Sequence, residues 1–121
     1  TDLPRGNNIS FELQCGIENS VISIIIFSKD YVGSRWCLNE LSKIMEEHRV
    51  QGQVVLPVFY GVDPSKVRNQ ISSFGDSFQD LIQRTSPTND QVLRWKTDLR
   101  EAGGIAGFVV LNSRAQNLWR G

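Results

Sequence analysis

The run from Val21 to Phe27, VISIIIF, constrains the fold more than any other part of this sequence. Its residues are β-branched or otherwise apolar except for Ser23, and the run is far too short to cross a lipid bilayer. Such a run is typical of a strand that other elements cover on both faces, as in a parallel sheet. We therefore expect a buried strand at the centre of an α/β domain.

Helices and strands alternate along the rest of the chain. Residues 1–8 resemble a loop, and Ser10 is expected to cap a helix because Leu13 and Ile17 have helical spacing. The second strand, 54–60, contains Pro57, which predicts a bulge or a missing N–H donor there. A helix is expected over 35–48, with Gly52 ending it, and one further helical turn is expected after Asp63. Two more helices are expected, one that begins at a cap at Ser72 or Ser73 and one that runs from Asn89 or Asp90 to Gly103. A last strand is expected over 108–111.

Length and charge narrow the class of protein. The 121 residues suit one domain, 1–121, and the formal net charge is zero, which gives no electrostatic case for a nucleic-acid or membrane partner. Two cysteines, Cys15 and Cys37, and one histidine are too few and too scattered for a metal site. A polar N-terminus without a signal peptide and the low cysteine content predict a cytoplasmic protein, with the nucleus also open.

The segment Ser34 to Leu41, SRWCLNEL, follows the first apolar strand and begins a helix. Ligands of open α/β sheets bind at this kind of junction, because strand ends border a crevice and helix N-termini carry partial positive charge. The segment supplies an aromatic ring, a thiol and a carboxylate. Taken alone, Glu40 fits a solvated helix residue paired with Lys43 better than it fits a functional group.

Four segments together resemble one family. LPRGNNISFEL, VISIIIFSKDYVGSRWCLNEL, GQVVLPVFYGVDPSKVRNQISSFGDSF and VLRWKTDLREAGGIAGF are similar, in order and spacing, to the TIR (Toll/interleukin-1 receptor) domain of plant disease-resistance receptors. The resemblance implies a flavodoxin-like, three-layer α/β/α fold around a parallel sheet. Because it begins in the loop after the family's second strand, we expect the domain to lack its first one or two strands and its first helix.

The same resemblance implies an activity and its residues. Plant TIR domains of this kind self-associate and hydrolyse NAD⁺ at the nicotinamide–ribose bond to trigger defence signalling. Their catalytic glutamate matches Glu40, and further site positions match Ser34 and Trp36; Arg5 lies in the loop that borders the family's pocket. NAD⁺ is then the substrate, with no cofactor and no metal, and other TIR domains are the expected partners.

One carboxylate is chemically sufficient for this reaction. Nicotinamide leaves a cationic glycoside as a neutral molecule, so no general acid is required, and a carboxylate can stabilise the oxocarbenium-like ribose. Trp36 fits a stacking wall for a base as well as it fits core packing, and Ser34 fits a helix N-cap as well as a site residue. Arg5 could contact a phosphate, although an exposed loop residue is the simpler interpretation, and Cys37 fits a small buried hydrophobe.

Three functions stay open at this stage. The first is a self-associating NAD⁺ hydrolase, and the second is a non-catalytic TIR–TIR interaction module in which Glu40 has no chemical role. The third is a generic flavodoxin-like ligand binder, which is disfavoured because no glycine-rich phosphate loop follows any predicted strand.

Overall fold

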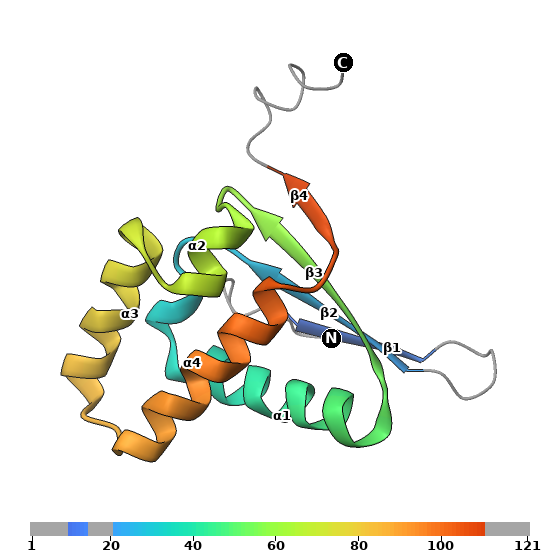
Figure 1. Cartoon of the computed structure of the whole chain (residues 1–121), viewed down its shortest axis with the longest axis horizontal. Coiled ribbons are helices and arrows are strands. Elements are labelled where there is room, and N and C mark those ends of the chain that lie inside the picture. Colours follow the sequence, from blue (N-terminus) through green and yellow to red (C-terminus); the bar gives the residue numbers. More distant parts are fainter. Residues whose placement is uncertain (1–9, 15–20, 111–121) are drawn as a thin grey trace.

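The computed structural model describes residues 10–14 and 21–110, with side chains for residues 22–110. The chain alternates strands with helices, and the four α-helices form a layer beside a twisted sheet (Figure 1). In chain order the elements are β1 (Ser10–Gln14), β2 (Val21–Phe27), the 3-10 turn η1 (Tyr31–Gly33), α1 (Arg35–Gln51), β3 (Val54–Tyr60), α2 (Pro64–Asn69), α3 (Ser72–Thr85), α4 (Asn89–Gly103) and β4 (Phe108–Val110).

The sheet has the strand order β1-β2-β3-β4. Strands β2, β3 and β4 are parallel, with Ile24 opposite Leu56 and Val58 opposite Phe108. This confirms the predicted α/β class with a parallel sheet. The register passes through Pro57, which lies opposite Ile25, without a slip. The bulge considered for this position is therefore not formed, and the sheet tolerates the proline in place.

The helix predicted from Ser10 is wrong, because Ser10–Gln14 forms strand β1. This strand pairs antiparallel with β2, from Ser10 opposite Ile25 to Gln14 opposite Val21. The five residues, SFELQ, alternate polar and apolar types, which is the period of a strand. Pairing also supplies hydrogen-bond partners to the edge of β2, whose N–H and C=O groups would otherwise lack them. These two effects outweigh the one helical spacing, from Leu13 to Ile17, on which the prediction rested.

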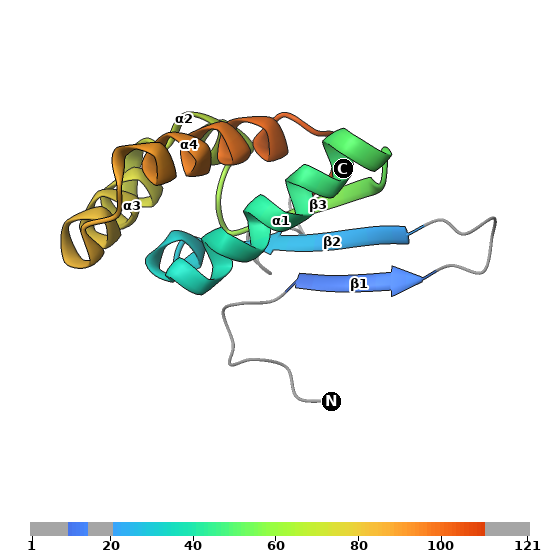
Figure 2. The ribbon, with the colours of Figure 1, turned by 90° about the horizontal axis from the view of Figure 1, so that it is seen from below.

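The helices cover one face of the sheet in the described part of the chain (Figure 2). On that face Ile25, Phe27 and Phe59 are at most 1% exposed. The neighbouring residues Ile24 and Leu56 point to the opposite face and are only half-buried. Among residues 10–14 and 21–110 the fold thus shows two layers, a sheet and one helical layer. The sequence prediction that β2 is covered on both faces holds for one face here.

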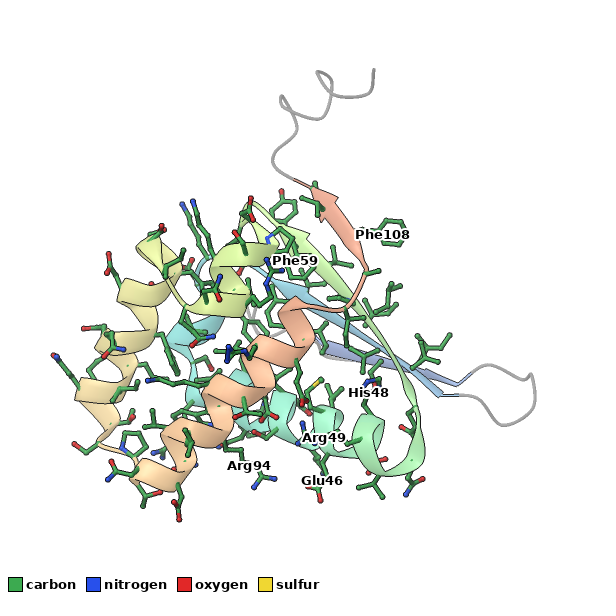
Figure 3. The ribbon with its side chains drawn as sticks, in the orientation of Figure 1. Glu46, His48, Arg49, Phe59, Arg94 and Phe108 are labelled. Atoms are coloured by element: carbon green, nitrogen blue, oxygen red, sulfur yellow. The ribbon has the colours of Figure 1, made fainter. Side chains whose placement is uncertain are left out.

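Aromatic side chains fill the space between the sheet and the helices. Phe27 stacks on Phe59 with ring centroids 5.6 Å apart and meets Tyr31 edge-on at 4.8 Å. Trp95 of α4 is 1% exposed, as expected for a core residue. In contrast, Phe108 is 62% exposed and is directed away from the helices (Figure 3).

Most helix ends follow their sequence signals. Gly52 ends α1 in the left-handed conformation at φ 70°, and Asp63 caps α2 by accepting from the N–H of Ser65. The cap predicted at Ser72 or Ser73 is wrong: Ile71 is the N-cap of α3 and offers no side-chain acceptor. Gln70 already ends α2 in the left-handed region, so Ile71 is the one residue left to join the two helices.

Gly103 lets α2 and α4 cross closely. A Cβ at Gly103 would lie 2.8 Å from the backbone nitrogen of Arg68, whereas at Gly104 the nearest atom, the carbonyl oxygen of Arg100, would be 3.5 Å away. Gly103→Ala should therefore lower the free energy of unfolding by about 1–3 kcal/mol through overpacking. Gly104→Ala, the matched control, should change it by less than about 0.5 kcal/mol. Urea unfolding measures both, and equal effects of the two substitutions would contradict the close crossing.

Candidate functional site

The start of α1 lies next to the carboxyl end of β2. After Phe27 the chain turns through η1, and Ser34 then caps the helix because its Oγ accepts a hydrogen bond from the N–H of Cys37 at 3.3 Å. The N-cap interpretation of Ser34 is confirmed by this contact. The cap places the first turns of α1, with Trp36 and Glu40, at the edge of the sheet where ligands of α/β folds bind.

Trp36 and Glu40 lie on one side of α1, because residues four apart are neighbours on a helix surface. The Trp36 side chain is 64% exposed, so the core-packing interpretation of this residue is wrong. Glu40 is half-buried. An indole that is open to solvent therefore stands one helical turn from a carboxylate. This arrangement can offer a stacking surface and a negative charge to the same ligand.

Tyr31 is a neighbour of Glu40 that the sequence did not indicate. Its side chain is 1% exposed, and its hydroxyl donates to the carbonyl oxygen of Cys37 at 3.2 Å. Burial raises the pKa of Tyr31 well above its usual value, and the charges of Cys37 and Glu40 raise it further. Tyr31 thus remains neutral and supports the first turn of α1 from beneath. The one sequence signal that could have indicated this role of Tyr31 is that an aromatic residue stands in the turn Ser28 to Gly33.

Cys37 is unsuited to be a nucleophile. Its side chain is 2% exposed, and burial raises the pKa of the thiol from 9.0 to about 11, although the Ser34 hydroxyl opposes the shift and Glu40 adds to it. A protonated, buried thiol is inert towards electrophiles. This confirms the prediction that Cys37 acts as a small buried hydrophobe.

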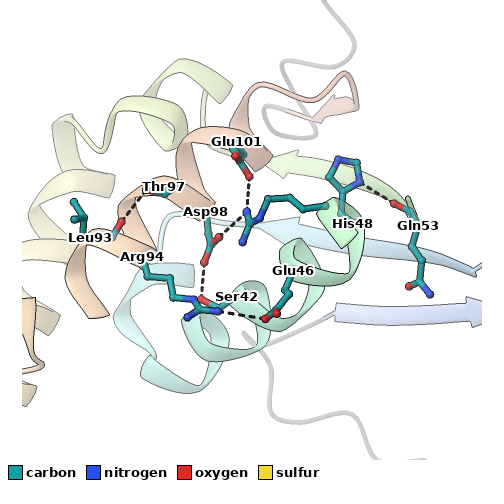
Figure 4. Close-up of polar contacts among 10 residues, drawn as sticks. Ser42, Glu46, His48, Gln53, Leu93, Arg94, Thr97, Asp98 and Glu101 are labelled. Atoms are coloured by element: carbon teal, nitrogen blue, oxygen red, sulfur yellow. Dashed lines mark hydrogen bonds and ion pairs between the residues drawn. The ribbon is translucent and has the colours of Figure 1, made fainter. Parts of the chain in front are cut away.

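A buried carboxylate joins α1 to α4 (Figure 4). Asp98 is fully buried; its Oδ2 accepts from the Ser42 hydroxyl at 2.5 Å, and its Oδ1 lies 3.3 Å from Nη1 of Arg49. The same Arg49 nitrogen is 2.6 Å from Glu101. Arg94 of α4 pairs with Glu46 of α1 at 3.3 Å (Figure 3). No local sequence pattern indicated a buried carboxylate at Asp98.

A cleft of about 330 Å³ lies beside these contacts, between the first half of α1 and the start of α4. Asn39 and Ser42 line it from α1, with Thr88 and Arg94 opposite. Neither Glu40 nor Trp36 is among its lining residues. The Nε1 of Trp95 donates to Oδ1 of Asn39 at 3.3 Å on the same side of α1. The fourth predicted site residue, Arg5, lies outside the described residues.

Two further properties concern the described part of the chain. Residues 10–14 and 21–110 contain no group of histidine, cysteine and carboxylate side chains that could hold a metal ion. Within the same ranges no helix has the length and apolar composition needed to cross a bilayer.

Comparison with known proteins identifies the family. A family model described as "TIR domain" matches residues 1–120. The chain belongs to the TIR domain family. It is 44% identical over 115 residues, 95% of its length, to disease resistance protein RPV1 of Vitis rotundifolia. It is 44% identical over 105 residues, 87% of its length, to TMV resistance protein N of Nicotiana glutinosa.

The chain spans only a small part of these relatives, 8% of RPV1 and 9% of protein N. Among solved structures, it resembles the TIR domains in the structure of the activated Roq1 resistosome, which directly recognises the pathogen effector XopQ. That match has a TM-score of 0.67 and 39% identity, and it covers 76% of this chain and 55% of the other. The chain thereby has the TIR-like flavodoxin fold, of which the described residues form the parallel strands β2, β3 and β4 and one helical layer.

The buried carboxyl of Asp98 predicts a pH dependence of stability. Burial raises the pKa of Asp98 above 3.8, although hydrogen bonds from Ser42 and Arg49 oppose the shift, so the folded chain holds this proton more tightly than the unfolded chain does. The stability that protonation contributes is fully present below pH 3.8 and is lost as the pH rises through the folded pKa. The free energy of unfolding of the wild type, relative to that of Asp98→Asn, should therefore fall as the pH rises above 3.8 in urea unfolding. If the difference in the free energy of unfolding between the two proteins stayed constant or grew as the pH rose, the raised pKa of Asp98 would be contradicted.

Proposed function

We propose that this chain is a signalling TIR domain of a plant immune receptor, which self-associates in the cytoplasm and hydrolyses NAD⁺ at the nicotinamide–ribose bond. The observation that carries the proposal is the pairing of Trp36 with Glu40 at the carboxyl end of β2, one exposed ring and one half-buried carboxylate on the same side of α1. The 44% identity to plant disease resistance proteins supports the immune role.

The proposed chemistry assigns one step to Glu40. The bond between ribose C1′ and the nicotinamide nitrogen breaks, its electron pair leaves with the neutral nicotinamide, and a water oxygen adds to C1′ and loses a proton. Glu40 stabilises the positive charge that develops on the ribose, where a carboxylate acts most strongly in a site that partly excludes water. Trp36 stacks on a base of the dinucleotide and so holds the ribose beside the carboxylate.

Ser34 has a supporting role in this proposal. Its hydroxyl fixes the first turn of α1 through the N–H of Cys37, and this turn carries Trp36. Arg5 is retained as a proposed phosphate contact on the strength of the family resemblance. Self-association is supported by the likeness to the TIR domains of the Roq1 resistosome, an assembled form of that protein.

The alternative function is a non-catalytic TIR–TIR interaction module. The same likeness to an assembled resistosome favours it, because assembly by itself does not require a reaction. The absence of Glu40 and Trp36 from the lining of the 330 Å³ cleft also suits this alternative. The two functions differ in one observable, which is the consumption of NAD⁺ by the associated protein.

Replacement of the carboxylate tests the catalytic proposal. Glu40→Ala should lower NAD⁺ consumption by the concentrated chain about 100-fold or more, since a group that acts on transition-state charge is lost. Glu47→Ala is the matched control, because Glu47 is an exposed glutamate of the same helix. Nicotinamide release is measured by chromatography, and the association state by light scattering. Equal rates for wild type and Glu40→Ala, with association intact, would leave the interaction module as the function.

The exposed indole provides a second test. Trp36→Ala should change the free energy of unfolding by less than about 0.5 kcal/mol, because little of the ring is buried. It should raise the KM for NAD⁺ about tenfold through the loss of stacking. Val50→Ala is the control, since Val50 is 72% exposed on the same helix. A large loss of stability in Trp36→Ala would show that the ring has a structural role instead.

A further inference from the structure

Three cationic side chains meet where α2 lies against α4. A cleft of about 300 Å³ at this place is lined by residues at the end of α2 and on α4, which are Arg68, Asn69, Gln70, Leu93, Lys96, Thr97 and Arg100. No carboxylate lines the cleft. We propose that it binds a small molecule carrying two or more phosphate groups, held by Arg68, Lys96 and Arg100. This proposal is independent of the proposed NAD⁺ hydrolysis.

The cations of this cleft differ from other cations of the helical layer. Arg49, Arg84 and Arg94 each lie within 3.3 Å of a carboxylate oxygen. Within residues 22–110, Arg68, Lys96 and Arg100 form no ion pair with a carboxylate. Asp63 is the acid whose charge interacts with Arg68, but its Oδ1 is already bound by the N–H and hydroxyl of Ser65, both at 2.8 Å. The cleft therefore presents three positive charges to an incoming anion, and no carboxylate is among its lining residues.

The spacing of these cations is unfavourable without a ligand. Lys96 and Arg100 are four residues apart on α4, and like charges at this spacing destabilise a helix. Arg68 adds a third positive charge from the facing helix. Arg68 and Arg100 lie in the last turns of their helices, where the partial negative charge of the helix C-terminus favours a cation, and this explains their positions. The same effect does not explain Lys96, which lies farther from the helix end.

The walls of the cleft are fixed in position by close packing. Gly103 brings the backbone of α2 against α4, and Nη1 of Arg68 donates to the Gly103 carbonyl oxygen at 3.3 Å. The Gln70 amide donates to the carbonyl oxygens of Val67 at 3.0 Å and Arg68 at 2.9 Å. The end of α2 is thus held in place before any ligand arrives, which lowers the entropic cost of binding.

The donors match phosphate chemistry. Arginine presents a planar set of N–H groups that bind two phosphate oxygens at once, and lysine adds a compact charge. The volume lies at the lower end of the range for small-molecule sites, which fits a pyrophosphate group or a nucleoside phosphate. Cations on both helices can contact neighbouring phosphates of one ligand, so two phosphate groups should bind more tightly than one.

Calorimetric titration of the 121-residue chain with sodium pyrophosphate at low ionic strength tests the proposal. We expect saturable binding of one pyrophosphate per chain, tighter than binding of inorganic phosphate. Lys96→Gln and Arg100→Gln should each weaken binding at least tenfold. Lys43→Gln, which removes the same charge from an exposed position on α1, should change it less than twofold. Circular dichroism confirms that each variant is folded.

Three results would overturn the proposal. The first is no saturable binding of pyrophosphate to the wild type, and the second is an equal loss of binding in Lys43→Gln and Lys96→Gln, which would indicate diffuse attraction. The third is that a single-stranded oligonucleotide binds through Lys96 and Arg100 while pyrophosphate does not bind. That result would indicate a surface for extended polyanions. Glu40→Ala should bind pyrophosphate like the wild type, so this test and the test of NAD⁺ hydrolysis fail separately.

Discussion

The parallel pairing of β2 with β3 is the constraint on which the rest of the structure depends. It aligns Ile25 and Phe27 of one strand with Pro57 and Phe59 of the next, and these four residues form the floor on which the helices pack. Because parallel strands need a crossover, α1 must return along the sheet between them. The start of α1 is thereby fixed at the carboxyl end of β2, and with it Trp36 and Glu40. The position of the candidate site is thus a consequence of sheet topology.

The orientation of α1 depends on a second constraint, the buried carboxylate of Asp98. A buried charge is costly unless hydrogen bonds and an opposite charge satisfy it, and here Ser42 and Arg49 of α1 do so. Few relative positions of α1 and α4 allow both contacts at once. The net contribution to stability is small or negative, but the contribution to a single helix arrangement is direct. Ser42 lies only two residues after Glu40, so this arrangement also sets where Glu40 points.

Strong local signals in the sequence predict the elements correctly, whereas segments whose structure depends on distant partners are mispredicted. The strand Val21–Phe27, the helix ended by Gly52 and the cap at Asp63 have unmistakable local patterns. The segment Ser10–Gln14 fits both the alternation of a strand and, through Leu13, the spacing of a helix. Its pairing with β2 makes it a strand, and no local sequence rule predicts that pairing. Asp98 resembles any exposed helical carboxylate until α1 is placed against it. For the same reason, the sequence did not decide whether Trp36 is buried or exposed, since a position on a helix does not say which side of the helix faces the core.

The distribution of charge over the fold carries information that composition does not. A formal net charge of zero gave no electrostatic case for a nucleic-acid or membrane partner. Helical geometry separates the charges of α4, however, since Asp98 and Glu101 share one side, facing Arg49 of α1, while Lys96 and Arg100 share another. The acids are thereby neutralised within the protein, and the cations remain on the surface beside Arg68. A sum over the sequence cannot detect this separation, because it depends on which residues of one helix face which neighbour.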